Sequence, residues 1–201
     1  KEAVIQDYNS QQVGALMSVV KNERVINVWD ACAASGGKSI MAKDRLGKIN
    51  LAVSDVRESI LHNLKKRFAE AGISNFQSFV ADLSANDPLP PGDQFDLVIA
   101  DVPCSGSGTW GRTPEQLYYF TENKANAYSR LQQKIISNLL PHIQPGGYLL
   151  YITCSVFKRE NELQVEYISA NKNFSLLRME CLKGYDKKAD TMFAALFRKE
   201  L

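Results

Sequence analysis

The chain has 201 residues, 45% of them hydrophobic, which is enough for one globular domain (1–201) with a single core. It contains no run of about 18 apolar residues, and its first residues lack the basic and apolar blocks of a secretory signal, so the sequence predicts neither a membrane span nor export. A net charge of +2 neither requires nor excludes a polyanionic partner. We expect a cytoplasmic monomer, and because the chain begins at Lys1 without a methionine we expect further sequence upstream.

Short β-branched runs alternate with longer segments of helical periodicity, the pattern of βαβ units around a largely parallel sheet. The predicted strands cover residues 25–30, 50–55, 76–80, 95–101, 147–153, 174–180 and 192–198. The predicted helices cover residues 10–20, 38–46, 58–71, 126–140 and 159–170. Gly72 marks a helix end, and turns are predicted at 88–92 and 145–147.

The last two predicted strands are joined by a short connection at 183–190, so we expect them to pair antiparallel at one edge of the sheet. The fold class that follows is α/β, a Rossmann-like, seven-stranded mixed sheet with one antiparallel edge strand. Four scattered cysteines without a Cys-x-x-Cys pair indicate reduced thiols and no metal cluster.

The first predicted strand runs into a loop of small residues and glycines that would let a ligand approach the backbone. The loop has neither the G-x-G-x-x-G spacing of a dinucleotide fingerprint nor the upstream glycine of a phosphate-binding P-loop. The residues predicted to bind a cofactor here are Ala33, Ala34, Ser35, Gly36, Gly37 and Lys38.

Aspartates close the next two predicted strands, Asp55 and Asp82. A carboxylate at the end of the second strand can accept from both hydroxyls of a ribose, and a side chain at the end of the third can reach an adenine amino group. Either aspartate alone would more often cap the next turn. Together with the glycine loop, and with Arg57 included in the same site, they predict an adenosyl cofactor.

Two cysteines, Cys104 and Cys154, follow apolar strands whose carboxyl ends should meet at the same sheet edge as the cofactor loop. We expect both thiols to face one cleft together with Asp101. Cys32 and Cys181 are instead predicted to be small buried hydrophobic residues. A redox-sensing disulfide between Cys104 and Cys154 is the less favoured alternative.

Two thiols beside an adenosyl cofactor suit the methylation of cytosine at C5. A thiolate that adds to C6 turns the weakly nucleophilic C5 into an enamine-like carbon that accepts a methyl group. The reaction also needs a donor at N3 and a group that helps to remove the C5 proton. Asp101 and Cys104 are candidates for these roles, and Asp101 would have to be buried and protonated to donate.

These segments resemble motifs of the Sun/Fmu family of RNA cytosine-5 methyltransferases, and the likeness covers nearly the whole chain. Residues 30–39 look like the family's Asp-x-Cys-Ala-Ala-Pro-Gly-Gly-Lys-Thr motif, with Ser35 in place of the proline, and residues 101–108 look like its Asp-x-Pro-Cys-Ser-Gly-x-Gly motif. Residues 153–155 and 160–162 resemble its Thr-Cys-Ser and Glu-Asn-Glu motifs. Residues 6–11 resemble the amino-terminal helix motif that contacts the methionine end of the cofactor.

The resemblance implies the fold of a class I methyltransferase dependent on S-adenosyl-L-methionine, and a division of labour between the thiols. Cys154 attacks C6, and Cys104 assists product release. Asp55 is implied at the ribose, Asp82 near the adenine, and Asp101 with Lys38 in the catalytic pocket.

The implied substrate is RNA, with ribosomal RNA first and transfer RNA second, bound without a membrane or a metal ion. Lys65, Lys66 and Arg67 are predicted to form a solvated helix face. The candidates for phosphate contacts are Arg112, Lys124, Arg130, Lys134, Lys158 and Arg159.

Two alternatives stay open. A DNA cytosine-5 methyltransferase would use Cys104 as its nucleophile, against which the Thr-Cys-Ser motif argues. A non-catalytic RNA-binding or assembly protein could keep the fold and hold the cofactor, against which both cysteines and Asp101 argue.

Overall fold

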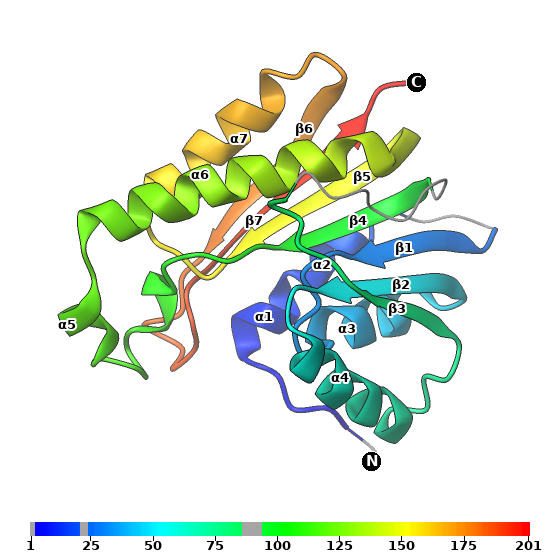
Figure 1. Ribbon diagram of the computed structural model, residues 1–201, viewed down its shortest axis with the longest axis horizontal. Coiled ribbons are helices and arrows are strands. Elements are labelled where there is room, and N and C mark those ends of the chain that lie inside the picture. Colours follow the sequence, from blue (N-terminus) through cyan, green and yellow to red (C-terminus); the bar gives the residue numbers. More distant parts are fainter. Residues whose placement is uncertain (1–2, 21–23, 86–93) are drawn as a thin grey trace.

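The computed structural model describes residues 3–20, 24–85 and 94–201, which form a seven-stranded sheet with helices on both faces (Figure 1). The strand order is β3-β2-β1-β4-β5-β7-β6, and β1 to β5 are parallel. The strands are β1 (Ile26–Asp30), β2 (Ile49–Asp55), β3 (Phe76–Val80), β4 (Phe95–Asp101), β5 (Ile143–Thr153), β6 (Phe174–Leu182) and β7 (Met192–Lys199). All seven predicted strands are present, and the Rossmann-like mixed sheet is confirmed.

The antiparallel strand of the sheet is β7, which pairs with both β5 and β6. The predicted antiparallel pairing of the last two strands is therefore confirmed, but the predicted edge position of the antiparallel strand is wrong. Residues 192–197 of β7 are all buried, as a strand inside a sheet requires, whereas most of β6 is partly or fully exposed. The edge strand on this side of the sheet is therefore β6, which runs parallel to β1 to β5.

The start of β5 also differs from the prediction, because the strand includes the turn expected at 145–147. Ile143 pairs with Phe95 and Tyr148 with Leu97, so extra residues bulge out of β5 between these two pairs. Gly146 adopts a φ of +76° within the bulge. The turn predicted at 88–92 lies outside the described residues.

The amino-terminal segment forms two short helices, α1 (Tyr8–Gln12) and α2 (Gly14–Met17), so the single helix predicted at 10–20 is wrong. Asp7 caps α1 by accepting from Ser10 N at 3.1 Å. At the junction the bonding becomes tighter, since Leu16 N bonds Val13 O (3.1 Å) three residues back. The side chain of Asn9 donates to Leu182 O and Asp190 O, which fixes α1 to the end of the sheet.

The other helices follow the predicted pattern with shifted ends. They are α3 (Gly37–Leu46), α4 (Glu58–Glu70), α5 (Gln116–Tyr119), α6 (Glu122–Leu139) and α7 (Glu162–Ser169). Thr121 caps α6 earlier than predicted, and α5 was not predicted. Asn161, at φ −119° and ψ −93°, separates α7 from the 3₁₀ turn η3 (Lys158–Glu160), so the helix predicted at 159–170 begins late. Among the described residues, no helix is long and apolar enough to cross a bilayer.

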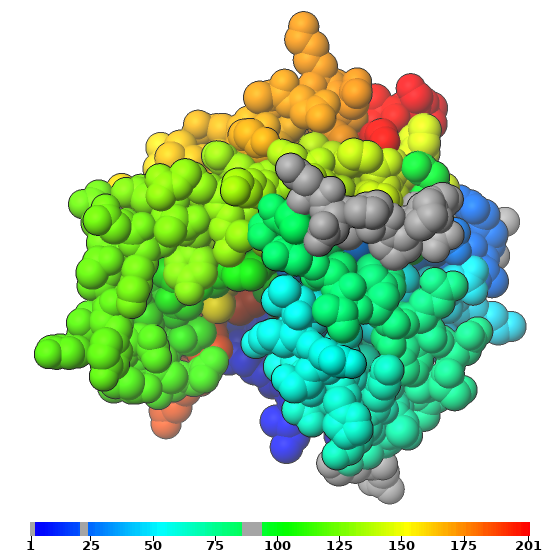
Figure 2. All heavy atoms as spheres, viewed as in Figure 1, coloured from blue at the N-terminus to red at the C-terminus, as the bar shows by residue number. Residues whose placement is uncertain are grey.

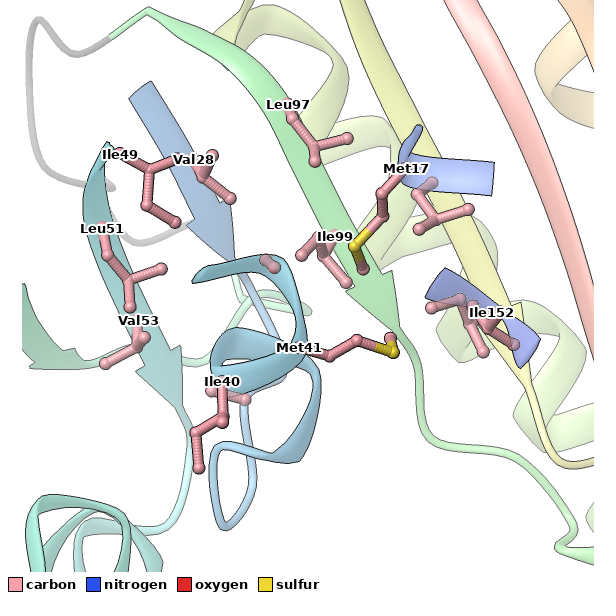
Figure 3. Packing of buried hydrophobic residues seen from close by; sticks show 14 of the residues in the cluster. Met17, Val28, Ile40, Met41, Ile49, Leu51, Val53, Leu97, Ile99 and Ile152 are labelled. Atoms are coloured by element: carbon pink, nitrogen blue, oxygen red, sulfur yellow. The ribbon is translucent and has the colours of Figure 1, made fainter. Parts of the chain in front are cut away.

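Alternate residues of the central strands belong to two cores, one on each face of the sheet. On one face, Val28 and Ile99 pack with Met17 of α2 and with residues of α3 (Figure 3). Residues of α4 belong to the same cluster. On the other face, Trp29 and Val98 pack with residues of α6 and α7. Because the sheet is buried on both sides, the loops after β1, β2, β4 and β5 leave a rigid base.

The loop between β1 and α3 turns at Gly36, whose φ of +82° lies in the left-handed region. A Cβ added there would lie 2.5 Å from Cε1 of Phe68 and 3.1 Å from Cγ of Leu64. The turn therefore needs glycine for two reasons, its backbone conformation and its close packing against α4.

We expect Gly36→Ala to lower the free energy of unfolding by roughly 2–5 kcal/mol, from about 1–2 kcal/mol for a left-handed alanine and about 1–3 kcal/mol for overpacking. Gly72→Ala is the matched control, because Gly72 has a φ of +73° and nothing within 4 Å of an added Cβ. It should lose only about 1–2 kcal/mol. Urea denaturation followed by circular dichroism measures both values, and equal losses would contradict the packing argument.

Candidate active site

Two thiols meet where β4 and β5 end. The strands are parallel neighbours with Asp101 opposite Ile152, so the residues that follow them emerge side by side. Cys154 follows β5 directly, Cys104 lies in the loop after β4, and their Sγ atoms are 3.4 Å apart. The structure thus brings together the two cysteines that the sequence singled out.

Both thiols line a cavity of about 510 Å³, and Cys154 also lines a second cavity of about 400 Å³. Cys32, Ala34 and Asp101 line both cavities, so the two adjoin at the carboxyl ends of the strands. Figure 2 shows the molecule hollowed between the green residues around α5 and the cyan residues that lead into α4. A ligand that extends through both cavities passes Cys154.

The contact between the thiols makes them chemically unequal. The hydrogen bond from the Cys104 thiol lowers the pKa of Cys154 below its ordinary value, outweighing burial, which would raise it. The same contact, together with burial, raises the pKa of Cys104 well above its ordinary value. Because the thiolate is the nucleophilic form, Cys154 is the better nucleophile of the two.

Glu160 holds the loop that carries Cys104. Its fully buried carboxylate accepts from the backbone N of Ser105 at 3.0 Å and from the hydroxyl of Ser105 at 2.6 Å. Its own carbonyl accepts from the Tyr151 hydroxyl at 2.6 Å, which ties η3 to β5. A buried, fully bonded carboxylate fixes the residue next to Cys104.

Asn161 holds the residues on either side of Cys154. Its Oδ1 accepts from the Thr153 hydroxyl at 2.6 Å, and its Nδ2 donates to Ser155 O at 2.8 Å. All three side chains are buried. Two adjacent residues, Glu160 and Asn161, therefore set the positions of both thiols.

Lys38 and Asp101 form an ion pair beside the thiols. Nζ of Lys38 lies 2.9 Å from Oδ2 of Asp101 and donates to the Ser10 hydroxyl at 2.8 Å. Burial would lower the pKa of Lys38, but the charge and hydrogen bond of Asp101 outweigh it and raise this pKa. The Asp101 side chain is 28% exposed, so it is not the deeply buried carboxyl that donation at N3 was expected to require.

Asp30 ends β1 beneath the cofactor loop and is completely buried. Its Oδ2 accepts from the Ser39 hydroxyl at 2.6 Å, while Oδ1 has no hydrogen-bond partner among the described residues. Burial raises the pKa of Asp30 to about 7. The residue fixes the first turn of α3 and lines neither cavity.

Asp55 ends β2 at the wall of the larger cavity. Its Oδ2 accepts from Ala34 N at 3.0 Å, and its Oδ1 accepts from the backbone N and Nε of Arg57 at 3.0 and 2.9 Å. Burial would raise the pKa of Asp55, but the hydrogen bonds and charge of Arg57 outweigh it and lower this pKa. The result is an ionised carboxylate tied to the glycine loop.

Asp82 lies just beyond β3, is exposed, and also lines the larger cavity. Its Oδ1 accepts from the backbone N and the hydroxyl of Ser84 at 2.9 and 2.7 Å, and these bonds lower the pKa of Asp82. The residue therefore caps a turn and faces the cavity as well.

The predicted cofactor residues divide between the two cavities. The larger is lined by Ala34, Asp55, Arg57, Asp82 and Asp101. The smaller is lined by Ala33, Ala34, Ser35, Gly37, Lys38 and Asp101. Gly36 lines neither, because its turn packs against α4. Among the described residues, no group of three or more His, Cys, Asp or Glu side chains could hold a metal ion.

The sequence model of the family described as 16S rRNA methyltransferase RsmB/F matches residues 15–197 of the chain. The chain belongs to this family. Curated relatives include the ribosomal RNA small subunit methyltransferase B of Xanthomonas campestris, which is 32% identical over 163 residues, or 81% of this chain and 37% of that protein. The Xylella fastidiosa protein of the same name is 32% identical over 165 residues, or 82% of this chain and 38% of that protein. The chain thus spans a little over a third of the length of these family members.

Solved structures share the fold. A crystal structure of PH0851 superposes with a TM-score of 0.87 at 28% identity, covering 98% of this chain and 47% of that one. The structure of NSun6 from Pyrococcus horikoshii with SFG gives a TM-score of 0.82 at 23% identity, covering 96% of this chain and 52% of that one.

Some contacts around the glycine loop between β1 and α3 could not be anticipated from the sequence. Arg67, predicted to be solvated, donates from Nη1 to the Ser35 hydroxyl at 2.8 Å, so that prediction is wrong for Arg67, while Lys65 and Lys66 are exposed. This bond holds the loop that carries Ser35. No periodicity reveals such a contact between α4 and a distant loop.

One of the remaining cysteines, Cys181, and one cation, Arg112, differ from expectation. Cys181 lies exposed on β6, so its predicted burial is wrong. Cys32 is enclosed between the two cavities, and burial raises the pKa of its thiol well above the ordinary value. Arg112, a candidate for a phosphate contact, donates from Nε and Nη2 to the Asp190 carboxylate at 2.7 and 2.8 Å. This pair fixes the loop before β7 against the loop after β4.

Removal of the Glu160 carboxylate should release the Cys104 loop. We expect Glu160→Ala to lower the free energy of unfolding by roughly 1–3 kcal/mol, because Ser105 loses its buried acceptor. Glu162→Ala is the matched control, a neighbouring carboxylate on the first turn of α7, and should change stability by less than about 0.5 kcal/mol. Chemical denaturation of both variants measures this, and equal stabilities would contradict the role of Glu160.

Removal of Cys104 should make the other thiol harder to ionise. Without the donor at 3.4 Å, the pKa of Cys154 rises, so the pH at which its alkylation by iodoacetamide becomes rapid moves upward in Cys104→Ala. Mass spectrometry of the peptide that contains Cys154 gives its rate separately from that of exposed Cys181. Cys32→Ala is the control. An unchanged or lower inflection in Cys104→Ala would refute the thiol contact.

Proposed function

We propose that the chain transfers a methyl group from S-adenosyl-L-methionine to C5 of a cytosine in RNA, with Cys154 as the nucleophile. The main observation in favour of this function is that the two thiols lie 3.4 Å apart where the two cavities adjoin. One cavity can take the cofactor's adenosine and the other adjoins its methionine end. Membership of the methyltransferase family supports the reaction class.

The residues of the larger cavity fit an adenosyl group. Apolar side chains of Leu83, Leu131 and Ile135 offer faces for an adenine, and the ionised Asp55 offers acceptors for ribose hydroxyls. The neighbour solved with SFG, an analogue of S-adenosyl-L-methionine, supports this use of the fold. When bound, the cofactor would supply an electrophilic methyl group.

The chain's own residues then have distinct roles. The Cys154 thiolate adds to C6 of the cytosine, which makes C5 nucleophilic. Lys38 lies 2.9 Å from Asp101 and carries the proton that is donated to N3 of the cytosine. Its positive charge stabilises the negative charge that the ring gains when the thiolate adds. Cys104 acts as the base for release: because its pKa is raised, its thiolate, formed once its own proton has passed to solvent, is the stronger base of the two. It takes the C5 proton, the C6–S bond breaks, and Cys154 leaves as the thiolate.

The proposed substrate is ribosomal RNA, because the relatives in Xanthomonas and Xylella are named as methyltransferases of the small-subunit ribosomal RNA. Transfer RNA ranks second. The reaction on this substrate would occur in the cytoplasm, and we propose a monomer as the active unit.

The geometry favours this assignment over attack by Cys104, the arrangement expected of a DNA cytosine-5 methyltransferase. The pKa of Cys154 is lowered and that of Cys104 raised, so the thiolate population resides on Cys154. A purely RNA-binding role would leave the positioned pair, and the Glu160 and Asn161 bonds behind it, without a use.

The test is to trap the adduct. Small-subunit ribosomal RNA transcribed with 5-fluorocytidine, incubated with the chain and cofactor, should remain covalently bound, because fluorine at C5 blocks the elimination. Peptide mapping should locate it on Cys154. Cys154→Ala should form no adduct. Cys104→Ala should form a slowly released adduct even with RNA that contains ordinary cytidine. Cys181→Ala, an exposed thiol on β6, is the control. An adduct on Cys104 would overturn the assignment.

A further inference from the structure

Residues 110–121, here called the aromatic lobe, project beyond the end of α6 beside the hollow (Figures 1 and 2). Their outermost side chains are apolar or aromatic and face solvent, since Leu117 is 57%, Tyr118 87% and Tyr119 60% exposed. The two tyrosine rings meet edge to face at 5.2 Å. Three large exposed side chains next to one another form an apolar surface patch, and such patches commonly mark binding sites.

The base of the aromatic lobe is rigid. Trp110 packs against Phe120 with ring centroids 5.0 Å apart and against Phe157 at 5.9 Å, while Phe120 and Phe157 stack at 5.0 Å. Nζ of Lys124 donates to Tyr119 O at 2.6 Å and holds the end of α5. The tyrosines are therefore displayed from a packed support.

The aromatic lobe is continuous with the active site. It begins two residues after Gly108, whose N donates to Cys154 O at 2.8 Å and whose O accepts from Thr191 N at 2.9 Å. A Cβ at Gly108 would lie 2.0 Å from Thr191 O, so the backbone at Gly108 is in direct contact with the backbone just before β7. The tyrosines are thus fixed in position relative to the nucleophile.

The surroundings of the aromatic lobe are basic. Lys124 and Lys158 are exposed beside it, whereas the charge of Arg112 is paired with the Asp190 carboxylate. The acidic Glu122 is paired with Arg159 at 3.1 Å. Exposed rings beside cations suit nucleotides, whose bases stack and whose phosphates pair with lysine and arginine.

We infer that the aromatic lobe binds single-stranded RNA next to the target cytosine, with Tyr118 and Tyr119 stacking on flanking bases. The inference rests on the proposed RNA substrate. A cytosine that reaches the half-buried Cys154 must leave its stack, so its neighbours lose a stacking partner. The tyrosines supply a replacement surface, and the cations beside them follow the backbone.

The test measures binding of a 12-nucleotide single-stranded RNA of cytidines with one 2-aminopurine, and of the same strand in a duplex. Tyr118→Ala and Tyr119→Ala should each raise the Kd for the single strand about 5-fold or more, the lower limit for loss of one stacked base. The fluorescence quenching of 2-aminopurine should diminish with them. Tyr118→Phe and Tyr119→Phe keep the ring and should bind normally, as should Tyr167→Ala on α7.

Salt dependence separates stacking from phosphate contacts. The slope of log Kd against log salt should stay unchanged in the tyrosine variants and fall by about 0.7 in Lys158→Ala, a lysine that does not hold α5. Wild-type affinity and quenching in both alanine variants would overturn the inference and leave the aromatic lobe as a protein-docking surface. Because binding is measured without turnover, absence of methyl transfer would refute the proposed function while tyrosine-dependent RNA binding still upheld this inference.

Discussion

The arrangement of the site depends on the parallel pairing of β4 with β5. Each strand leaves the buried sheet at the same end, so the loops that carry Cys104 and Cys154 have little choice of direction. The pairing alone would leave the thiols on two independent loops. The bonds from Glu160 to Ser105 and from Asn161 to Thr153 and Ser155 remove that freedom and give the 3.4 Å contact.

This contact has an electrostatic consequence that neither cysteine would have alone. A half-buried thiol pays for desolvation of its thiolate, and burial raises the pKa of Cys32 for this reason. Cys154 escapes the rise because a second thiol donates to it and because the cation of Lys38 lies close. Lys38 in turn keeps its charge within the protein because its Nζ lies 2.9 Å from Oδ2 of Asp101, which raises the pKa of Lys38. Ionisation of Cys154 thus depends on Cys104, on Lys38 and, through Lys38, on Asp101.

The sequence was sufficient for the parts of this design that follow from strand ends. Alternation of apolar runs located all seven strands, and their carboxyl ends placed Asp55, Asp101 and both thiols on one edge. It failed where a contact joins segments far apart. The last strand, β7, lies between β5 and β6 because its residues are buried on both faces of the sheet. The bond from Arg67 to Ser35 joins α4 to the loop between β1 and α3. Neither leaves a periodic signal.

One short segment joins a tightly held part of the site to a part that is open to solvent. At Gly108 the backbone is held on both sides and no side chain fits, whereas ten residues later Tyr118 is almost fully in solvent. The packed rings of Trp110, Phe120 and Phe157 support the short helix α5, which carries Tyr118. A reaction that needs a base held at one sulfur atom requires the catalyst to be immobile and the substrate surface to be open. The segment satisfies both because its aromatic residues are half-buried and packed together at the base and are exposed at the tip.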